Sequence, residues 1–146
     1  MGIMVHLDAI AYGPVFSKLN HFSESVGIQK YITWHSGLSG EFYVYKFAKL
    51  LKTSDLFVFA PTIASNGDVE VGPSISDIHA QAVGVLVVST PYPGMEISIT
   101  NNLTAFFCQG DSVSEISNHV LKYIQDKEFY LSVGRAGIDK VKKSLL

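Results

Sequence analysis

The sequence predicts an α/β fold: a Rossmann-like, doubly wound, mostly parallel sheet of about five strands, with helices on both faces. Short runs rich in Val, Ile, Phe and Tyr recur along the chain, and several are apolar on both faces. Strands that lie between two layers of helices have this composition. Segments with apolar residues three or four positions apart separate the runs, and that spacing is typical of helices. This alternation predicts parallel strands joined by right-handed helical crossovers.

Each expected strand is a short apolar run bounded by residues that favour turns. Loops rich in Gly, Ser, Asn and Pro follow several of the runs, for example at Ser65–Asp68 and Tyr92–Gly94. These residue types commonly end regular structure. We therefore expect five strands, at Ile3–Ala11, Tyr31–Trp34, Leu56–Ala60, Val85–Ser89 and Ala105–Cys108.

The expected helices are segments whose apolar residues fall on one face. In the first of them, Val15, Leu19, Phe22 and Val26 are spaced by four, three and four positions. This spacing aligns the four side chains along one side of a helix. The same reasoning predicts four further helices, around Val44–Leu51, Ser74–Val83, Val113–Ile124 and Lys127–Leu145.

The composition indicates a single globular domain spanning residues 1–146. Hydrophobic residues make up 47% of the 146 residues and charged residues 16%, which fits a chain that buries a core and excludes a disordered one. The formal net charge is -2. A protein that binds nucleic acid needs an excess of basic residues to neutralise phosphates. The charge therefore argues against nucleic acid as a partner.

The cysteine count, the length of the apolar runs and the first residues of the chain together suggest a cytoplasmic location. The single cysteine, Cys108, excludes an internal disulfide framework and fits a reducing compartment. Apolar runs such as Leu56–Pro61 are far shorter than the roughly 20 residues that cross a bilayer, and Met1–Pro14 lacks the basic start of a signal peptide. The five histidines show no metal-ligand spacing. We expect a soluble cytoplasmic domain without a metal or cofactor.

A ligand site is expected at the carboxyl edge of the sheet, where open α/β sheets bind their ligands. The strands at 56–60 and 85–89 both end in loops at this edge. The first loop enters a helix through Gly72 and Pro73, so free backbone N–H groups and the positive end of the helix dipole suit a diphosphate. Glu70, just before this step, can accept hydrogen bonds from sugar or ribose hydroxyls.

Motifs in this region resemble those of a known enzyme family. Ser54–Asp111 contains an aspartate-led strand ending in Pro-Thr, then an Asn-Gly-Asp-Val-Glu loop, a Gly-Pro helix entrance and a Gly-Met-Glu turn. This ordered series is similar to the donor-binding region of family 4 glycosyltransferases, which have the GT-B fold. It most resembles the branch that builds exopolysaccharides such as colanic acid and amylovoran. Ala11–Pro14 and His35–Ser39 are similar to two further turns of the family, so the resemblance covers nearly the whole chain.

The resemblance implies roles for individual residues. Glu70 matches the first of two donor-pocket glutamates, which holds sugar hydroxyls or stabilises charge near the transferring carbon, and is therefore the catalytic candidate. His79 falls on the second glutamate position, which usually binds the ribose hydroxyls. The remaining candidates are expected to contact the donor's phosphates or sugar. The substrate-binding set is Gly13, Gly72, Pro73, Ser74, His79, Gly94, Met95 and Glu96.

The chain departs from the family pattern at several of these positions. A neutral imidazole at His79 offers one acceptor where a carboxylate offers two oxygens. Eight residues separate Glu70 from His79, where the family has seven, and one extra helical residue rotates a side chain by about 100°. Met95 stands in place of a proline, and Val71 and Ala105 in place of glycines. These changes weaken the expected donor pocket.

The resemblance also implies that residues 1–146 form only the nucleotide-sugar-binding domain. The family's acceptor-binding N-terminal domain and the first βα unit of this domain, with an Arg and a Lys that bind donor phosphate, would lie outside them. In the doubly wound order 3-2-1-4-5-6 the first strand is central. We therefore expect closed-up or imperfect strand pairing, modest stability and a chain that does not transfer sugar by itself.

Three functions remain open on sequence grounds. The resemblance implies a retaining transferase that moves a hexose from a nucleotide-diphosphate sugar to a polysaccharide or lipid-linked glycan and needs no metal. It also allows the full-length enzyme to be peripheral to the inner face of the membrane. His79 and the altered spacing favour a non-catalytic remnant that binds nucleotide or a partner chain. A flavodoxin-like or receiver-like signalling domain has the right size, but the acidic cluster that a receiver needs after its first strand is missing.

Overall fold

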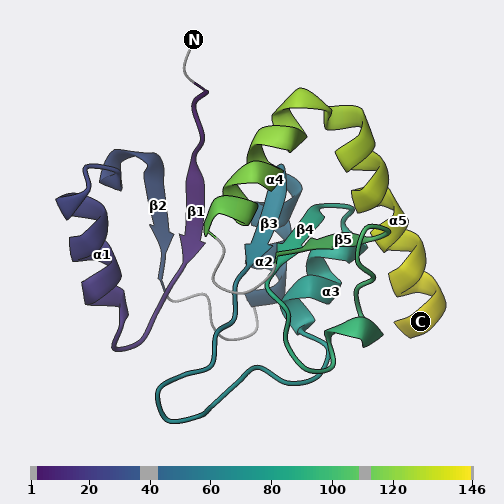
Figure 1. The fold of residues 1–146 in the computed structure, drawn as a ribbon, viewed down its shortest axis with the longest axis horizontal. Coiled ribbons are helices and arrows are strands. Elements are labelled where there is room, and N and C mark those ends of the chain that lie inside the picture. The colour runs from purple at the N-terminus through teal and green to yellow at the C-terminus, as the bar shows by residue number, and fades with distance from the viewer. Residues whose placement is uncertain (1–2, 37–42, 109–112, 146) are drawn as a thin grey trace. The chain divides into compact units, whose positions relative to one another are not determined.

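The computed structural model describes residues 3–36, 43–108 and 113–145, in which strands and helices alternate (Figure 1). The expected strands and helices all occur, with ends that differ by a few residues. The strands are β1 (Leu7–Ile10), β2 (Ile32–His35), β3 (Leu56–Phe59), β4 (Leu86–Ser89) and β5 (Ala105–Phe107). The helices are α1 (Phe16–Ser25), α2 (Tyr43–Lys52), α3 (Ile75–Ala82), α4 (Val113–Gln125) and α5 (Lys127–Leu145), with short 3-10 turns η1 (Gln29–Tyr31) and η2 (Met95–Ile97).

The chain divides into two compact units, Met1–Phe47 and Ala48–Leu146. All strand pairs are parallel, as predicted, and they form two sheets among the described residues: β1–β2 in the first unit and β3–β4–β5 in the second. The expectation of one five-stranded sheet is corrected on this point. The described residues supply no strand that pairs with both groups.

In the first unit, β1 and β2 pair with Leu7 opposite Ile32 and Ile10 opposite His35. Side chains of successive strand residues point to opposite faces. One face carries Trp34, whose ring meets the ring of Phe16 of α1 edge-on at 5.4 Å. The other face carries a polar pair, His35 Nε2 and Asp8 Oδ1, which are 2.7 Å apart.

The apolar stripe predicted for α1 exists, but its side chains are largely exposed. Its four side chains keep between 45% and 61% of their surface exposed. Instead the helix packs through Phe16 and through Ser23, which is buried. The four exposed residues are Val15, Leu19, Phe22 and Val26.

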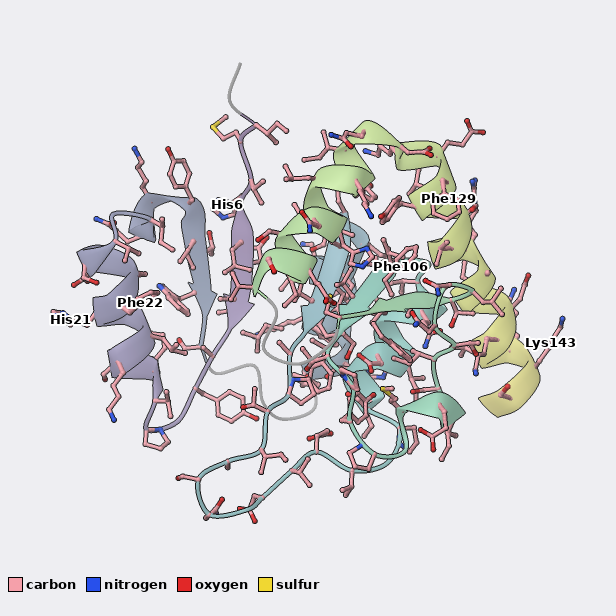
Figure 2. All side chains as sticks on the ribbon, viewed as in Figure 1. His6, His21, Phe22, Phe106, Phe129 and Lys143 are labelled. Atoms are coloured by element: carbon pink, nitrogen blue, oxygen red, sulfur yellow. The ribbon has the colours of Figure 1, made fainter. Side chains whose placement is uncertain are left out.

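In the second unit, β4 is the central strand and is buried at all four positions. Helices α3 and α5 contact it and each other, and α4 packs on α5. Aromatic rings contribute much of this core: the rings of Phe106 of β5 and Tyr130 of α5 have centroids 4.9 Å apart. Phe129 of α5, labelled with Phe106 in Figure 2, is half exposed beside them, with its centroid 6.2 Å from that of Phe106. The main core cluster consists of Leu86, Val88, Phe106, Cys108, Tyr123, Tyr130 and Val133.

The helices of the described residues are short or polar on one side. None of them combines the length and apolar character that a membrane-crossing helix needs.

Candidate functional site

The carboxyl edge of the β3–β4–β5 sheet carries the loops in which the sequence places a ligand site. The exits of β3 and β4 are tied together: the Thr90 N–H donates to the Phe59 carbonyl at 3.0 Å, and Thr90 Oγ1 donates to the Pro61 carbonyl at 2.8 Å. Beside them lies a groove of about 780 Å³, within the size range of small-ligand pockets. The groove is lined by Pro61, Thr62, Ile63, Val69, Thr90, Pro91 and Tyr92.

The two loops expected to share this edge are in direct contact. The Gly72 N–H donates to the Pro93 carbonyl at 2.8 Å. A Cβ atom added to Gly94 would lie 2.6 Å from the Gly72 Cα, closer than any real side chain tolerates. Gly94 also has a φ of +88°, which residues with a side chain rarely adopt. The predicted juxtaposition of the helix entrance with the Tyr92–Glu96 turn is therefore confirmed.

A buried polar network joins the same two loops. Asp77, in the first turn of α3, is fully buried, and its carboxylate accepts a hydrogen bond from the Tyr92 hydroxyl. The Tyr92 oxygen in turn accepts a bond from the Ser74 N–H at 3.4 Å. Gln81, one turn further along α3, donates to the Ser98 carbonyl at 2.9 Å. The network connects α3 to the segment that follows β4.

Burial controls the ionisation of this network. Loss of solvent raises the pKa of the Asp77 carboxyl to about 6; the Tyr92 hydroxyl opposes the rise, and the negative charge of Glu70 adds to it. Burial, and then the hydrogen bond and charge of Asp77, raise the pKa of the Tyr92 hydroxyl far above its ordinary value. Near neutral pH, Tyr92 is therefore the proton donor of the pair.

A family model described as "Glycosyl transferases group 1" matches residues 4–140, which is most of the chain. The chain belongs to the glycosyl transferases group 1. No curated protein sequence matches it significantly. The family match agrees with the glycosyltransferase resemblance.

Solved structures of low sequence identity share the fold. HepE of Anabaena, in complex with UDP, superposes with a TM-score of 0.74 at 13% identity, covering 96% of this chain and 36% of HepE. A TarM mutant from S. aureus, in complex with fondaparinux, alpha-GlcNAc-glycerol and UDP, gives 0.77 at 16% identity, covering 97% of this chain and 26% of TarM. The C-terminal domain of the Francisella tularensis group 1 transferase LpcC gives 0.68 at 15%, covering 88% and 60%.

These structures confirm a GT-B, Rossmann-like fold for the group 1 chain. The chain spans 36% of the solved HepE chain, 26% of the TarM chain and 60% of the solved C-terminal domain of LpcC.

The predicted site residues of this group 1 chain occupy different surroundings. Glu70 is exposed in the loop before α3, close enough for its charge to act on Asp77. Pro73 is half-buried, and Ser74 is the buried N-cap residue of α3, with no side-chain capping bond. His79 is half-buried on α3.

The other half of the site is the turn that leads into η2. Met95 and Glu96 begin η2 directly after Gly94. The Met95 N–H donates to the Tyr92 carbonyl at 3.3 Å, and Lys140 of α5 donates to the Glu96 carbonyl at 3.3 Å. The turn is thus braced from within and from α5.

Gly13 lies in the Met1–Phe47 unit, away from this set in the chain. Its carbonyl accepts a bond from the Phe16 N–H at 3.2 Å, in the turn that opens α1. Its expected contact with the donor stays a prediction.

Sequence reasoning missed Asp77, Tyr92 and Gln81. A signal for the first and third was present, because Ala80 and Gln81 follow Asp77 by three and four positions and so lie on the same face of the expected helix. Two polar residues on a face that packs inward indicate a buried network. For Tyr92 the Pro-Tyr-Pro context predicts only a turn.

The described residues hold no group of three or more His, Cys, Asp or Glu side chains arranged to bind a metal ion. Cys108 is buried at the end of the β5 region, and burial raises its thiol pKa. A raised pKa disfavours the thiolate that nucleophilic chemistry requires. We assign Cys108 to the core.

Proposed function

We propose that this chain is the donor-binding part of a retaining hexosyltransferase, which binds a nucleotide-diphosphate sugar at the carboxyl edge of the β3–β4–β5 sheet. The observation that carries the proposal is the contact between the Gly72 entrance of α3 and the Gly94 turn. The contact brings together a helix N-terminus, an exposed carboxylate and a groove of suitable volume. This combination suits a ligand with an anionic diphosphate and a polar sugar.

In this proposal, different residues contact different parts of the ligand. Backbone N–H groups in the first turn of α3 have no partner within the helix, and together with those near Gly94 they face the diphosphate. Glu70 accepts hydrogen bonds from the sugar hydroxyls and stabilises positive charge developing at the transferring carbon. His79 takes the place of the second glutamate toward the ribose, with one acceptor nitrogen.

UDP is the first nucleotide to test. HepE has been crystallised with UDP and with UDP-glucose, and the TarM mutant with UDP. These ligands belong to those proteins, and their shared fold supports a uridine donor for this one as a proposal.

The acceptor side of the reaction is proposed from the family resemblance alone. We propose a growing polysaccharide or lipid-linked glycan, within the family 4 branch that builds exopolysaccharides, in the cytoplasm and peripheral to the inner face of the membrane. Since the chain spans about a third of HepE, the acceptor would bind a further domain, and transfer would require both parts.

A second candidate is a non-catalytic member of the family that binds nucleotide without transferring sugar. His79 favours it, because an imidazole cannot reproduce the two acceptor oxygens of the family's second glutamate. His79→Glu separates the two candidates. If the domain is a working donor site with one weakened contact, the substitution tightens UDP-sugar binding; no change in affinity supports the remnant.

Calorimetric titration of the purified chain with UDP-, GDP- and ADP-glucose tests the donor site. We expect binding in the millimolar range or tighter, and about tenfold weaker binding for Glu70→Ala, since a hydrogen bond to a charged group contributes about 1.5 kcal/mol or more. Glu128→Ala, which removes an exposed carboxylate in the first turn of α5, is the matched control and should bind as the wild type does. No heat with any nucleotide sugar would rule out the donor site.

A further inference from the structure

Asp77 and Tyr92 form a buried pair to which the proposed function gives no role, although Tyr92 is one of the residues that line the groove. Asp77 has no exposed surface and Tyr92 keeps 4%. A buried carboxyl loses its hydration, which costs several kcal/mol unless partners replace the water. Oδ1 of Asp77 has no hydrogen-bond partner among the described residues, so the position is not one that stability alone would favour.

The geometry of the pair fixes the direction of its hydrogen bonds. Because the Tyr92 hydroxyl proton points at Asp77 Oδ2, an oxygen lone pair is left to face the Ser74 N–H. The Tyr92 ring is itself held in place by Phe59 at the end of β3, edge-on with centroids 5.5 Å apart. One side chain thus connects the end of β3, the start of α3 and the turn after β4.

We propose that Asp77 and Tyr92 are positioning residues for the donor loops. Asp77 orients the Tyr92 hydroxyl, and Tyr92 holds the 70–74 segment at a fixed distance from the 92–96 turn. The expected effect on donor affinity rests on the proposed function. The claim that the pair holds the two loops together does not depend on it. Neither side chain is placed to touch the ligand through a charged group, because the carboxyl is fully enclosed.

The surroundings of Asp77 limit what else could hold it. The groups that act on it electrostatically are the Tyr92 hydroxyl, from the turn after β4, and Glu70, from the loop before α3. On its own helix, the Gln81 side-chain nitrogen lies 3.4 Å from the Asp77 backbone carbonyl and does not reach the carboxylate. Tyr92 is therefore its principal hydrogen-bond partner among the described residues.

Three substitutions distinguish a role in positioning the loops from a contribution to the overall stability of the fold. Tyr92→Phe removes the hydroxyl and keeps the ring. Asp77→Leu removes the acceptor with an apolar side chain of larger but tolerable volume, a change that buried ionic positions often accept. Asp77→Asn is the conservative variant, because its amide oxygen can still accept the Tyr92 proton.

The matched control is Tyr123→Phe. Tyr123 keeps 5% of its surface exposed, and its hydroxyl donates to Asp55 at 2.8 Å. This pair is also a buried tyrosine donating to an aspartate, but Asp55 directly precedes β3, at the amino edge of the sheet. The same substitution there removes a tyrosine–aspartate hydrogen bond, to a carboxylate that is exposed and also pairs with Lys127, without affecting the donor loops.

Hydrogen exchange followed by NMR tests the mechanical claim without a ligand. We expect Tyr92→Phe and Asp77→Leu to speed exchange of the Gly72 and Ser74 amides about fivefold or more, in line with one lost hydrogen bond. Asp77→Asn should stay within about twofold of wild type, and Tyr123→Phe should leave both amides unchanged. Equal exchange at Gly72 and Ser74 in wild type and Tyr92→Phe would overturn the claim, as would equal acceleration by Tyr123→Phe.

Calorimetry with UDP-glucose tests the functional consequence. Tyr92→Phe and Asp77→Leu should raise Kd by about fivefold to tenfold, with rescue in Asp77→Asn. Unchanged affinity in Tyr92→Phe contradicts the positioning role while leaving the donor site standing. If the wild type itself does not bind UDP, GDP or ADP sugars, the proposed function fails, and the exchange rates alone decide whether the pair holds the loops.

Discussion

The β1–β2 pair and the β3–β4–β5 sheet arise from similar apolar runs, yet they are covered very differently. In β4 all four residues are buried, and Leu86 keeps 2% of its surface exposed, while Leu7 of β1 keeps 49%. The difference follows from neighbours: β4 has a strand on each side and contacts α3 and α5. The candidate donor loops leave the sheet whose central strand is buried throughout, where packing can hold them in place.

Replacing one leucine with alanine in each sheet tests this comparison and should give the largest difference in stability. Leu86→Ala removes a buried side chain and should lower the free energy of unfolding by about 3–4 kcal/mol. Leu7→Ala, on a half-exposed side chain, should cost under about 1 kcal/mol. Urea unfolding followed by circular dichroism measures both values. Equal losses would show that β1 is as well covered as β4.

The second prediction concerns pH and the second unit alone. The folded-state pKa of Asp77, about 6, exceeds its ordinary value of 3.8, so between these values the folded chain holds a proton that the unfolded chain has released. The resulting stabilisation is present below about pH 4 and is lost as the pH rises through 6, with a magnitude of about 3 kcal/mol.

Asp77→Asn removes this dependence. Relative to wild type, the variant should gain about 3 kcal/mol of stability between pH 4 and pH 7.5 in parallel urea titrations. Other carboxyls titrate in both chains and cancel in the difference. A difference between variant and wild type that does not change with pH would mean that Asp77 is not buried as described.

The third prediction tests the contact between the two loops. Gly94→Ala combines a positive φ with a clash against the Gly72 backbone, and we expect a loss of about 2 kcal/mol together with loss of donor binding. Gly67→Ala is the control, since Gly67 has a similar φ of +89° but nothing within 4 Å of an added Cβ. It should cost only the backbone strain, about 1 kcal/mol. If Gly94→Ala and Gly67→Ala weakened donor binding equally, the contact between the two loops would not explain the loss.

Much of the fold was predictable because apolar periodicity is a strong signal. Runs such as Val85–Ser89, apolar on both faces, and the stripe of α4 gave elements within a few residues of their final ends. That the Gly72–Pro73 entrance and the Tyr92–Glu96 turn share one edge of the sheet also followed from sequence, because loops at the carboxyl ends of adjacent parallel strands meet there.

Other features depend on tertiary context that periodicity does not carry. The stripe from Val15 to Val26 was correctly placed on one face of α1, but spacing does not reveal whether anything covers that face. The separation into two sheets depends on which strands are available to pair. Asp77 and Tyr92 are 15 positions apart, and their pairing depends on the distance between α3 and the turn after β4.

The most direct test of the central claim is to map UDP-glucose on the chain by amide chemical shifts. We predict that shifts concentrate in residues 70–76 and 92–96, with smaller changes at Thr62 and Val69 in the groove. A second groove of about 380 Å³, near Asn102 and His119 between β5 and α4, provides an internal comparison and should stay unchanged. Shifts centred on Asn102 and His119, with Gly72 and Gly94 unaffected, would contradict the donor-site assignment.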